Sequence, residues 1–112
     1  MSRDREFLFD IIESAERAVG CMGQRALDDF IGDPQCCDAV VRRLEVVGDA
    51  SRRVSEATRR SHPEAPWQEM ISMRNLVIHE YDAVDLSVIW DTVRNDLPRI
   101  VPVVRQIMNA LK

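Results

Sequence analysis

Apolar residues recur with the period of an α-helix along most of the chain, beginning with residues 3 to 22. In this first stretch they follow the i, i+3, i+4 spacing of one buried helix face, and they are Phe7, Leu8, Ile11, Ile12, Ala15, Ala18, Val19 and Met22. Gly20 and Gly23 indicate that the helix frays near its end. A short further turn is expected at residues 26 to 31, ahead of a Gly-Asp-Pro break.

A second stretch, residues 35 to 60, is predicted to form one long helix. At about 100° per residue, its main stripe is mostly apolar and comprises Val40, Leu44, Val47, Ser51, Val54 and Thr58. Gly48 lies at the edge of this stripe. Because a glycine inside a helix costs about 1 kcal/mol relative to alanine, its presence predicts a close-packed neighbour.

The same stretch carries a second, weaker stripe of mostly small residues, which are Ala39, Val46, Ala50 and Ala57. Two interpretations remain open. Alanine is a good helix former by itself, and a small-residue face also lets another backbone approach closely, as in a dimer contact. The outer face of this helix carries charges of both signs at i, i+3 and i+4 spacing, and they are Arg42, Glu45, Asp49, Arg53, Glu56 and Arg60.

A third helix is predicted to start near Pro66, because proline suits the first helical position, and to run to about Ile78. One broad face of this helix collects Trp67, Met70, Ile71, Arg74, Val77 and Ile78. These residues would pack toward the rest of the protein.

The fourth helical stretch follows Asp85, a suitable N-cap residue, and carries a long apolar stripe over residues 86 to 111. Pro98 and Pro102 lie inside it. Each proline removes a backbone donor and clashes with the preceding turn, so a kink or break is expected near residues 96 to 98.

Four helices joined by short loops predict an all-α fold, an antiparallel four-helix bundle, and the 112 residues fit a single domain over residues 1–112. The chain is 46% hydrophobic and 30% charged, an ordinary balance for a globular protein. No apolar run approaches the roughly 20 residues that span a bilayer. The first ten residues do not resemble a signal peptide. We therefore expect no membrane association and a cytoplasmic location.

The net charge of −4 is unusual for a protein that coats nucleic acid, because phosphate neutralisation supplies much of the affinity of such proteins. A small local phosphate site remains compatible with this charge. The cysteines are Cys21, Cys36 and Cys37, an odd number with no CxxC motif and no zinc-ligand spacing. They are interpreted as free thiols that pack as small hydrophobes. No metal and no cofactor is predicted.

The candidate chemistry lies in the stretch RNLVIHEYD, residues 74 to 82. Arg74 and His79 are five residues apart, so on a straight helix they would point about 140° apart. They converge only if the helix ends between them. Arginine binds phosphate oxygens through a fixed fork of donors, and histidine transfers protons near neutral pH. Asn75 supplies a hydrogen-bonding amide, and Tyr81 can stack on a base or form a hydrogen bond.

Such a set of side chains could cleave RNA without a metal. A base removes the 2′-hydroxyl proton, the oxygen attacks the adjacent phosphorus, and an arginine stabilises the negative charge. One histidine is few for a reaction that needs an acid and a base, and a two-fold dimer would supply a second. The same residues also fit structural roles, with His79 at a helix C-terminus, Arg74 in an ion pair and Tyr81 in the core.

Two longer stretches carry a family resemblance. RRLEVVGDASRRVS is similar to the second-helix pattern of HepT-like proteins of the HEPN superfamily, and PWQEMISMRNLVIHEYDAVDLSVIWDTVRNDLP contains the order Trp, Arg-Asn-x-x-x-His-x-Tyr, Ile-Trp and Leu-Pro that is typical of the same family. The resemblance covers nearly the whole chain and is strongest from Arg42 to Pro98.

The resemblance implies a helical, metal-independent endoribonuclease toxin of a type II toxin-antitoxin system, active as a homodimer with its site in a cleft between the two copies. Arg74 and His79 match the catalytic arginine and histidine, and Asn75 matches the polar residue after that arginine. Tyr81 matches the tyrosine that an MntA-type nucleotidyltransferase antitoxin modifies with AMP. Asp49 stands where many relatives have glutamate, which leaves the role of this carboxylate open.

Three hypotheses follow. The chain is a ribonuclease toxin that acts on RNA, or it is a binding and regulatory module without catalysis that docks the nucleotidyltransferase and is modified on Tyr81. The third hypothesis is a helical dimer without chemistry, in which the polar residues between positions 74 and 81 are caps.

Overall fold

The structure, a computed structural model, describes residues 2 to 78 and 85 to 111. Within these ranges it is all helical, as predicted. The elements in chain order are α1 (Asp4–Met22), α2 (Leu27–Ile31), α3 (Pro34–Arg53), α4 (Glu56–Ser61), α5 (Trp67–Ser72), α6 (Asn75–Ile78), α7 (Leu86–Asp91), η1 (Thr92–Asp96) and α8 (Leu97–Ala110).

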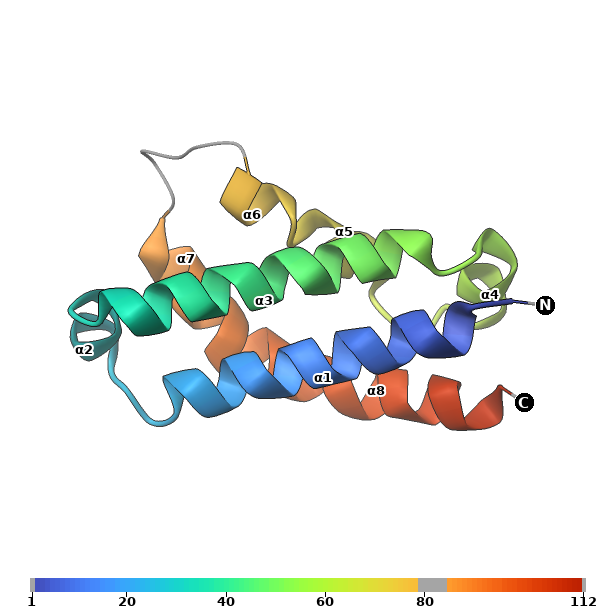
Figure 1. Cartoon of the computed structure of the whole chain (residues 1–112). Coiled ribbons are helices and arrows are strands. Elements are labelled where there is room, and N and C mark those ends of the chain that lie inside the picture. Colours follow the sequence, from blue (N-terminus) through green and yellow to red (C-terminus); the bar gives the residue numbers. More distant parts are fainter. Residues whose placement is uncertain (1, 79–84, 112) are drawn as a thin grey trace.

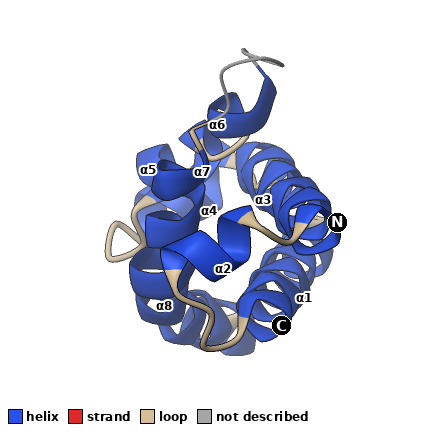
Figure 2. Cartoon of the chain, turned by 90° about the vertical axis from the view of Figure 1, so that its left-hand side faces the viewer, coloured by secondary structure: helices blue, strands red, loops and turns tan. Residues whose placement is uncertain are grey.

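Helix α1 runs antiparallel to both α3 and α8 and packs against both of them (Figure 1). One apolar core lies between them, and its fully buried members include Leu8, Ile11, Phe30, Val40, Leu44, Met70, Ile100 and Val104. The short helix α2 lies across one end of the bundle, as the end-on view shows (Figure 2). Its Phe30 is completely buried, so α2 closes this end of the core.

The single helix predicted for residues 35 to 60 is wrong, because α3 ends at Arg53 and α4 begins at Glu56. The buried Asp4 carboxylate of α1 accepts hydrogen bonds from the residues at this break. The Ser55 N–H donates to Asp4 Oδ1 at 2.9 Å, and the hydroxyls of Ser55 and Thr58 donate to Asp4 Oδ2 at 2.6 Å and 2.5 Å. The Ser55 hydroxyl also accepts from the Thr58 N–H and caps α4.

A continuous helix from Pro66 to Ile78 is also wrong. Helix α5 ends at Ser72, and α6 begins at Asn75. In between, the Met73 and Arg74 N–H groups donate to carbonyl oxygens three residues earlier, at 3.2 Å and 3.4 Å. This tighter turn rotates the chain, and Met73, which the predicted helix face omitted, is buried in the core.

The last helix follows the prediction more closely. The Asp85 side chain accepts a hydrogen bond from the Ser87 N–H at 2.9 Å and caps α7, as expected. The irregularity expected near residues 96 to 98 is a π-helical turn, η1, that immediately precedes Leu97. Helix α8 then continues without a break through Pro102. None of the described helices combines the length and the apolar character that a bilayer crossing requires.

Candidate functional site

Arg74 lies in the turn between α5 and α6, where the chain presses against α3. A Cβ atom added to Gly48 would lie 2.5 Å from the Arg74 backbone nitrogen and 2.7 Å from the Arg74 Cβ. Both distances are shorter than real Cβ contacts, so only glycine fits between these two segments. The close-packed neighbour predicted for Gly48 is therefore confirmed, and it is the candidate catalytic arginine itself.

A surface hollow of about 300 Å³ opens beside this junction. Helices α1 and α3 form most of its wall, and its lining residues are Phe7, Asp10, Arg42, Glu45, Val46, Asp49, Ala50, Arg53 and Arg74. Three guanidinium groups and three carboxylates thus share one hollow. The Arg74 side chain is half-buried there, which strengthens its interaction with any anion that enters.

Several charges around the hollow pair with one another along α3. Arg42 contacts Glu45 at 2.6 Å, and the Asp49 carboxylate lies 3.6 Å from Arg52 and 3.8 Å from Arg53. Within residues 2 to 78 and 85 to 111, no carboxylate lies within ion-pairing distance of Arg74. The guanidinium of Arg74 is thus not neutralised by the part of the chain that the structure describes.

Of the other predicted site residues, only Asn75 lies within the described part of the chain. Asn75 is exposed and begins α6, directly after Arg74. His79 and Tyr81 lie outside the described residues. The convergence of Arg74 with His79 therefore stays a prediction, as do the roles of Asn75 and Tyr81.

Sequence reasoning missed that the charged outer face of α3 contributes to the hollow beside Arg74. Arg42 and Arg53 were interpreted only as part of a charged outer face, and Asp10 was not singled out at all. The small-residue stripe is also corrected. Val46 and Ala50 line the hollow, but Ala57 does not share their helix because α3 ends at Arg53. No local signal separates a charge beside a hollow from a charge in open solvent.

In the described part of the chain, no three histidine, cysteine, aspartate or glutamate side chains gather in a way that could hold a metal ion.

Comparison with known proteins gives the chain a family. A family model described as "Ribonuclease HepT-like" matches residues 11 to 107. The chain belongs to this family. The matched range includes the whole of α3, the Arg74 junction and the stretch that contains His79 and Tyr81.

Individual relatives agree with the family match. The HepT-like chain is 38% identical over 96 residues to "Probable ribonuclease HepT" of Thermococcus cleftensis, covering 86% of this chain and 87% of the relative. It is 36% identical over 96 residues to "Putative RNase MJ1380" of Methanocaldococcus jannaschii, with 86% and 88% covered. It is 31% identical over all 112 residues to "Putative RNase TTE0752" of Caldanaerobacter subterraneus subsp. tengcongensis, with 100% of each chain covered. No solved structure matches the chain significantly.

Proposed function

We propose that this chain is a metal-independent endoribonuclease toxin of a type II toxin-antitoxin system, in which Arg74 and His79 act on RNA at a homodimer cleft in the cytoplasm. The observation that carries the proposal is the ribonuclease HepT-like family match across residues 11 to 107. The half-buried Arg74 beside an open hollow supports it, because a guanidinium without a protein partner in the described residues can receive a phosphate.

In the proposed reaction, His79 removes the proton of a ribose 2′-hydroxyl. The 2′-oxygen attacks the adjacent phosphorus, the bond from phosphorus to the 5′-oxygen breaks, and an acid protonates the departing oxygen. Arg74 binds the phosphate oxygens, which become more negative in the transition state. Asn75 is proposed to support this site through a hydrogen bond.

A homodimer completes the proposed chemistry. Each chain has one histidine in the RNLVIHEYD stretch, whereas the reaction needs both a base and an acid. Two-fold symmetry would bring a second His79 and a second Arg74 to the same cleft. The acidic groups of the hollow, Asp10, Glu45 and Asp49, would disfavour loose RNA binding and leave recognition to a narrow site around Arg74.

The decisive test compares His79→Ala with the wild type on RNA in the presence of EDTA. We expect the wild type to cut and His79→Ala to lose at least 10²-fold in rate, since general acid-base groups contribute about 10²–10⁴-fold. His62→Ala is the matched control, because the chain has two histidines and His62 is paired with Glu64 at 3.1 Å. Equal rates for wild type and His79→Ala would show that His79 is not catalytic. Loss of wild-type cleavage in EDTA would show that the reaction requires a metal ion.

The alternative is a non-catalytic binding and regulatory module that docks an MntA-type nucleotidyltransferase antitoxin and accepts AMP on Tyr81. Tyr81 is the one tyrosine of the chain, so modification can be assigned by intact mass alone. We expect one AMP mass on the wild type after incubation with the transferase and ATP, and none on Tyr81→Phe. An unmodified wild type, or an equally modified variant, would exclude Tyr81 as the acceptor.

Both functions are compatible in one protein. A nucleotidyl group on Tyr81, two residues from His79, would add negative charge where the RNA phosphate is proposed to bind. If the chain accepts AMP but cuts no RNA, either before modification or after the AMP group is removed, the result would favour the binding module over the enzyme.

A further inference from the structure

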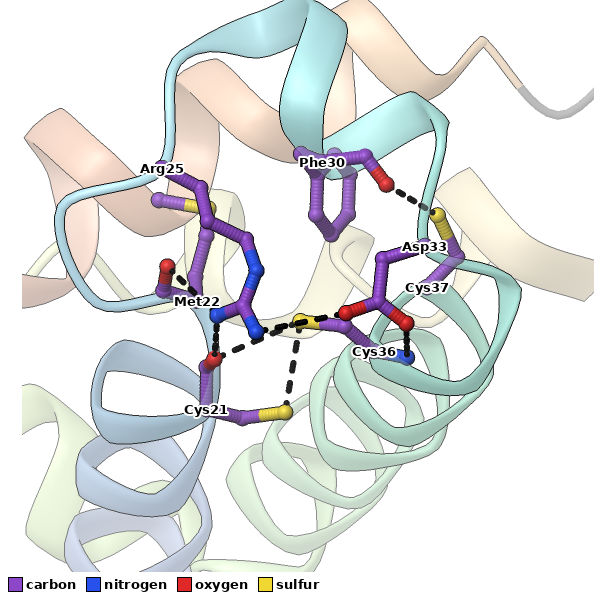
Figure 3. A network of polar contacts seen from close by, with 7 residues as sticks. All are labelled: Cys21, Met22, Arg25, Phe30, Asp33, Cys36 and Cys37. Carbon is purple, nitrogen blue, oxygen red and sulfur yellow. Dashed lines mark hydrogen bonds and ion pairs between the residues drawn. The ribbon is translucent and has the colours of Figure 1, made fainter.

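Two cysteines from different helices meet at the end of the bundle that α2 closes. Cys21 lies in the last turn of α1 and Cys36 in the first turn of α3, and their Sγ atoms are 3.3 Å apart (Figure 3). The Cys21 thiol donates to Cys36 Sγ, and the Cys36 thiol donates to the Cys21 carbonyl oxygen at 3.4 Å. Fourteen residues separate them in sequence, and their closeness results from the tertiary fold.

Hydrogen bonds and an ion pair made by Arg25 and Asp33 connect the end of α1 to the start of α3. The Arg25 guanidinium donates to the carbonyl oxygens of Cys21 and Met22 and contacts the Asp33 carboxylate at 3.2 Å (Figure 3). Asp33 in turn accepts from the Cys36 N–H at 3.1 Å and caps α3. These contacts hold the backbone at the two helix ends from which the Cys21 and Cys36 side chains extend.

The two thiols differ in accessibility. Cys21 is half-buried and can be reached from solvent, whereas Cys36 is 4% exposed. Burial and the hydrogen bond with Cys21 raise the pKa of the Cys36 thiol to about 11. The neighbouring Cys37 points elsewhere and donates to the Phe30 carbonyl oxygen at 3.1 Å (Figure 3). A solvent-borne reagent would therefore react first with Cys21.

We propose that Cys21 and Cys36 form an oxidation site, at which a low-molecular-weight disulfide converts the dithiol into an intramolecular disulfide that joins α1 to α3. The Cys21 thiolate attacks one sulfur of the reagent, forms a mixed disulfide and releases one thiolate. Cys36 loses its proton and attacks the Cys21 sulfur, which releases the second thiolate. Two thiols of the protein are oxidised and one reagent disulfide is reduced to two thiols.

The geometry permits this bond with small movements. A disulfide has an S–S distance of about 2.0 Å, so the sulfurs at 3.3 Å need to approach by little more than an ångström. The resulting loop encloses α2, and the Arg25 carbonyl oxygen in that loop accepts a hydrogen bond from Trp90 Nε1 at 2.9 Å. Oxidation would therefore join α1 to α3 directly at the end of the bundle where this loop already contacts Trp90 of α7.

The test incubates the full-length wild type with glutathione disulfide, then unfolds the protein in denaturant and blocks all remaining thiols with an alkylating reagent. We expect a product that lacks two hydrogen masses, carries one alkyl group on Cys37 and contains a Cys21–Cys36 peptide on digestion. A Tm increase of about 5–10 °C should accompany it and disappear on reduction, because the bond closes a loop of about 15 residues. Three alkylated cysteines, a stable glutathione adduct or a bridge between chains would overturn the proposal.

Two variants separate the partners. Cys37→Ala removes the adjacent buried thiol on the same helix and should still form the Cys21–Cys36 bond with no free thiol left. Cys36→Ala removes the second thiol of the pair and should stop at one glutathione on Cys21. If Cys37→Ala abolishes the bridge in a folded protein, Cys37 is a bridging cysteine and the assignment is wrong. The wild-type peptide map decides the question even if a variant fails to fold.

Discussion

Two helix interruptions that the sequence pattern does not reveal have opposite chemical characters. At residues 54 and 55, between α3 and α4, the polar groups of the break are satisfied inside the protein, because the buried Asp4 carboxylate accepts from Ser55 and Thr58. At residues 73 and 74, between α5 and α6, the break directs Arg74 to a hollow, without an ion-pair partner among the described residues. The first interruption stabilises the fold, and the second leaves a charge available for a ligand.

This difference teaches where function can be expected in a small bundle. A charge whose hydrogen bonds are complete contributes stability and has no capacity left for a substrate. A half-buried charge held beside a hollow keeps that capacity, because the protein has partly removed its water without replacing it. Mutations at the two interruptions should therefore separate stability from activity.

Among the variants at the two interruptions, the largest effect is expected from Arg74→Ala. It should lower the rate of RNA cleavage by about 10²–10³-fold, the usual loss when one donor to a transition-state oxyanion is removed. It should change the free energy of unfolding by no more than about 0.5 kcal/mol, since no described carboxylate depends on Arg74. Arg105→Ala, which breaks a surface pair with Glu16, is the matched control and should leave cleavage unchanged.

The cleavage rate and urea unfolding of both variants check this prediction. An Arg74→Ala protein that unfolds easily yet cuts RNA at the wild-type rate would reverse the comparison, because Arg74 would then be structural.

The opposite pattern is expected for Asp4→Ala. It removes a buried acceptor from the Ser55 N–H and from the hydroxyls of Ser55 and Thr58. Unfolding by urea should show a loss of about 2–3 kcal/mol, because hydrogen bonds to a charged group are stronger than average and the half-buried donors lose their acceptor. RNA cleavage below the new melting temperature should stay at the wild-type rate. A cleavage defect in a folded Asp4→Ala protein would contradict the division between the two interruptions.

The pH dependence of stability should report the same carboxylate. Burial by itself would raise the pKa of Asp4, but the hydrogen bonds from Ser55 and Thr58 outweigh burial and lower it below the ordinary value of 3.8. Because the folded pKa is the lower one, the stabilisation is fully present above pH 3.8 and is lost as pH falls through the folded pKa. Asp4→Asn should therefore lose less stability than the wild type when acidified over this window.

Local patterns predicted much of the fold. Apolar spacing identified the helical stretches, the Asp85 cap was correct, and Gly48 correctly indicated a close neighbour. The two interruptions could not be predicted, because contacts between distant segments cause them. Asp4 meets Ser55 from 51 residues away, and the fit of Arg74 against Gly48 depends on how α5 and α6 cross α3.

The candidate site was predictable only in part, for the same reason. The types and spacing of Arg74 and His79 suggest phosphodiester chemistry without any structure. The contribution of Arg42 and Arg53 to the hollow required the packing of α1, α3 and the Arg74 junction. The nearness of Cys21 to Cys36 likewise depends on the turn that folds α3 back along α1.

The smallest expected effect, and the one that links the two halves of the comparison, comes from Gly48→Ala. Helix propensity favours alanine by about 1 kcal/mol, but the new Cβ would lie 2.5 Å from the Arg74 backbone nitrogen, which cannot rotate away. Overpacking should dominate and leave a net loss of about 1–2 kcal/mol. Gly20→Ala is the matched control, because a Cβ there meets nothing within 4 Å, and it should gain about 0.5–1 kcal/mol.

Gly48→Ala should also lower RNA cleavage by about tenfold or more, because the shift that relieves the clash moves the Arg74 backbone and misplaces its guanidinium. Gly20→Ala should cut at the wild-type rate, since Gly20 lies on α1 away from the lining of the hollow. If both variants gain stability and cut RNA equally well, the close contact with Gly48 of α3 does not determine the position of Arg74.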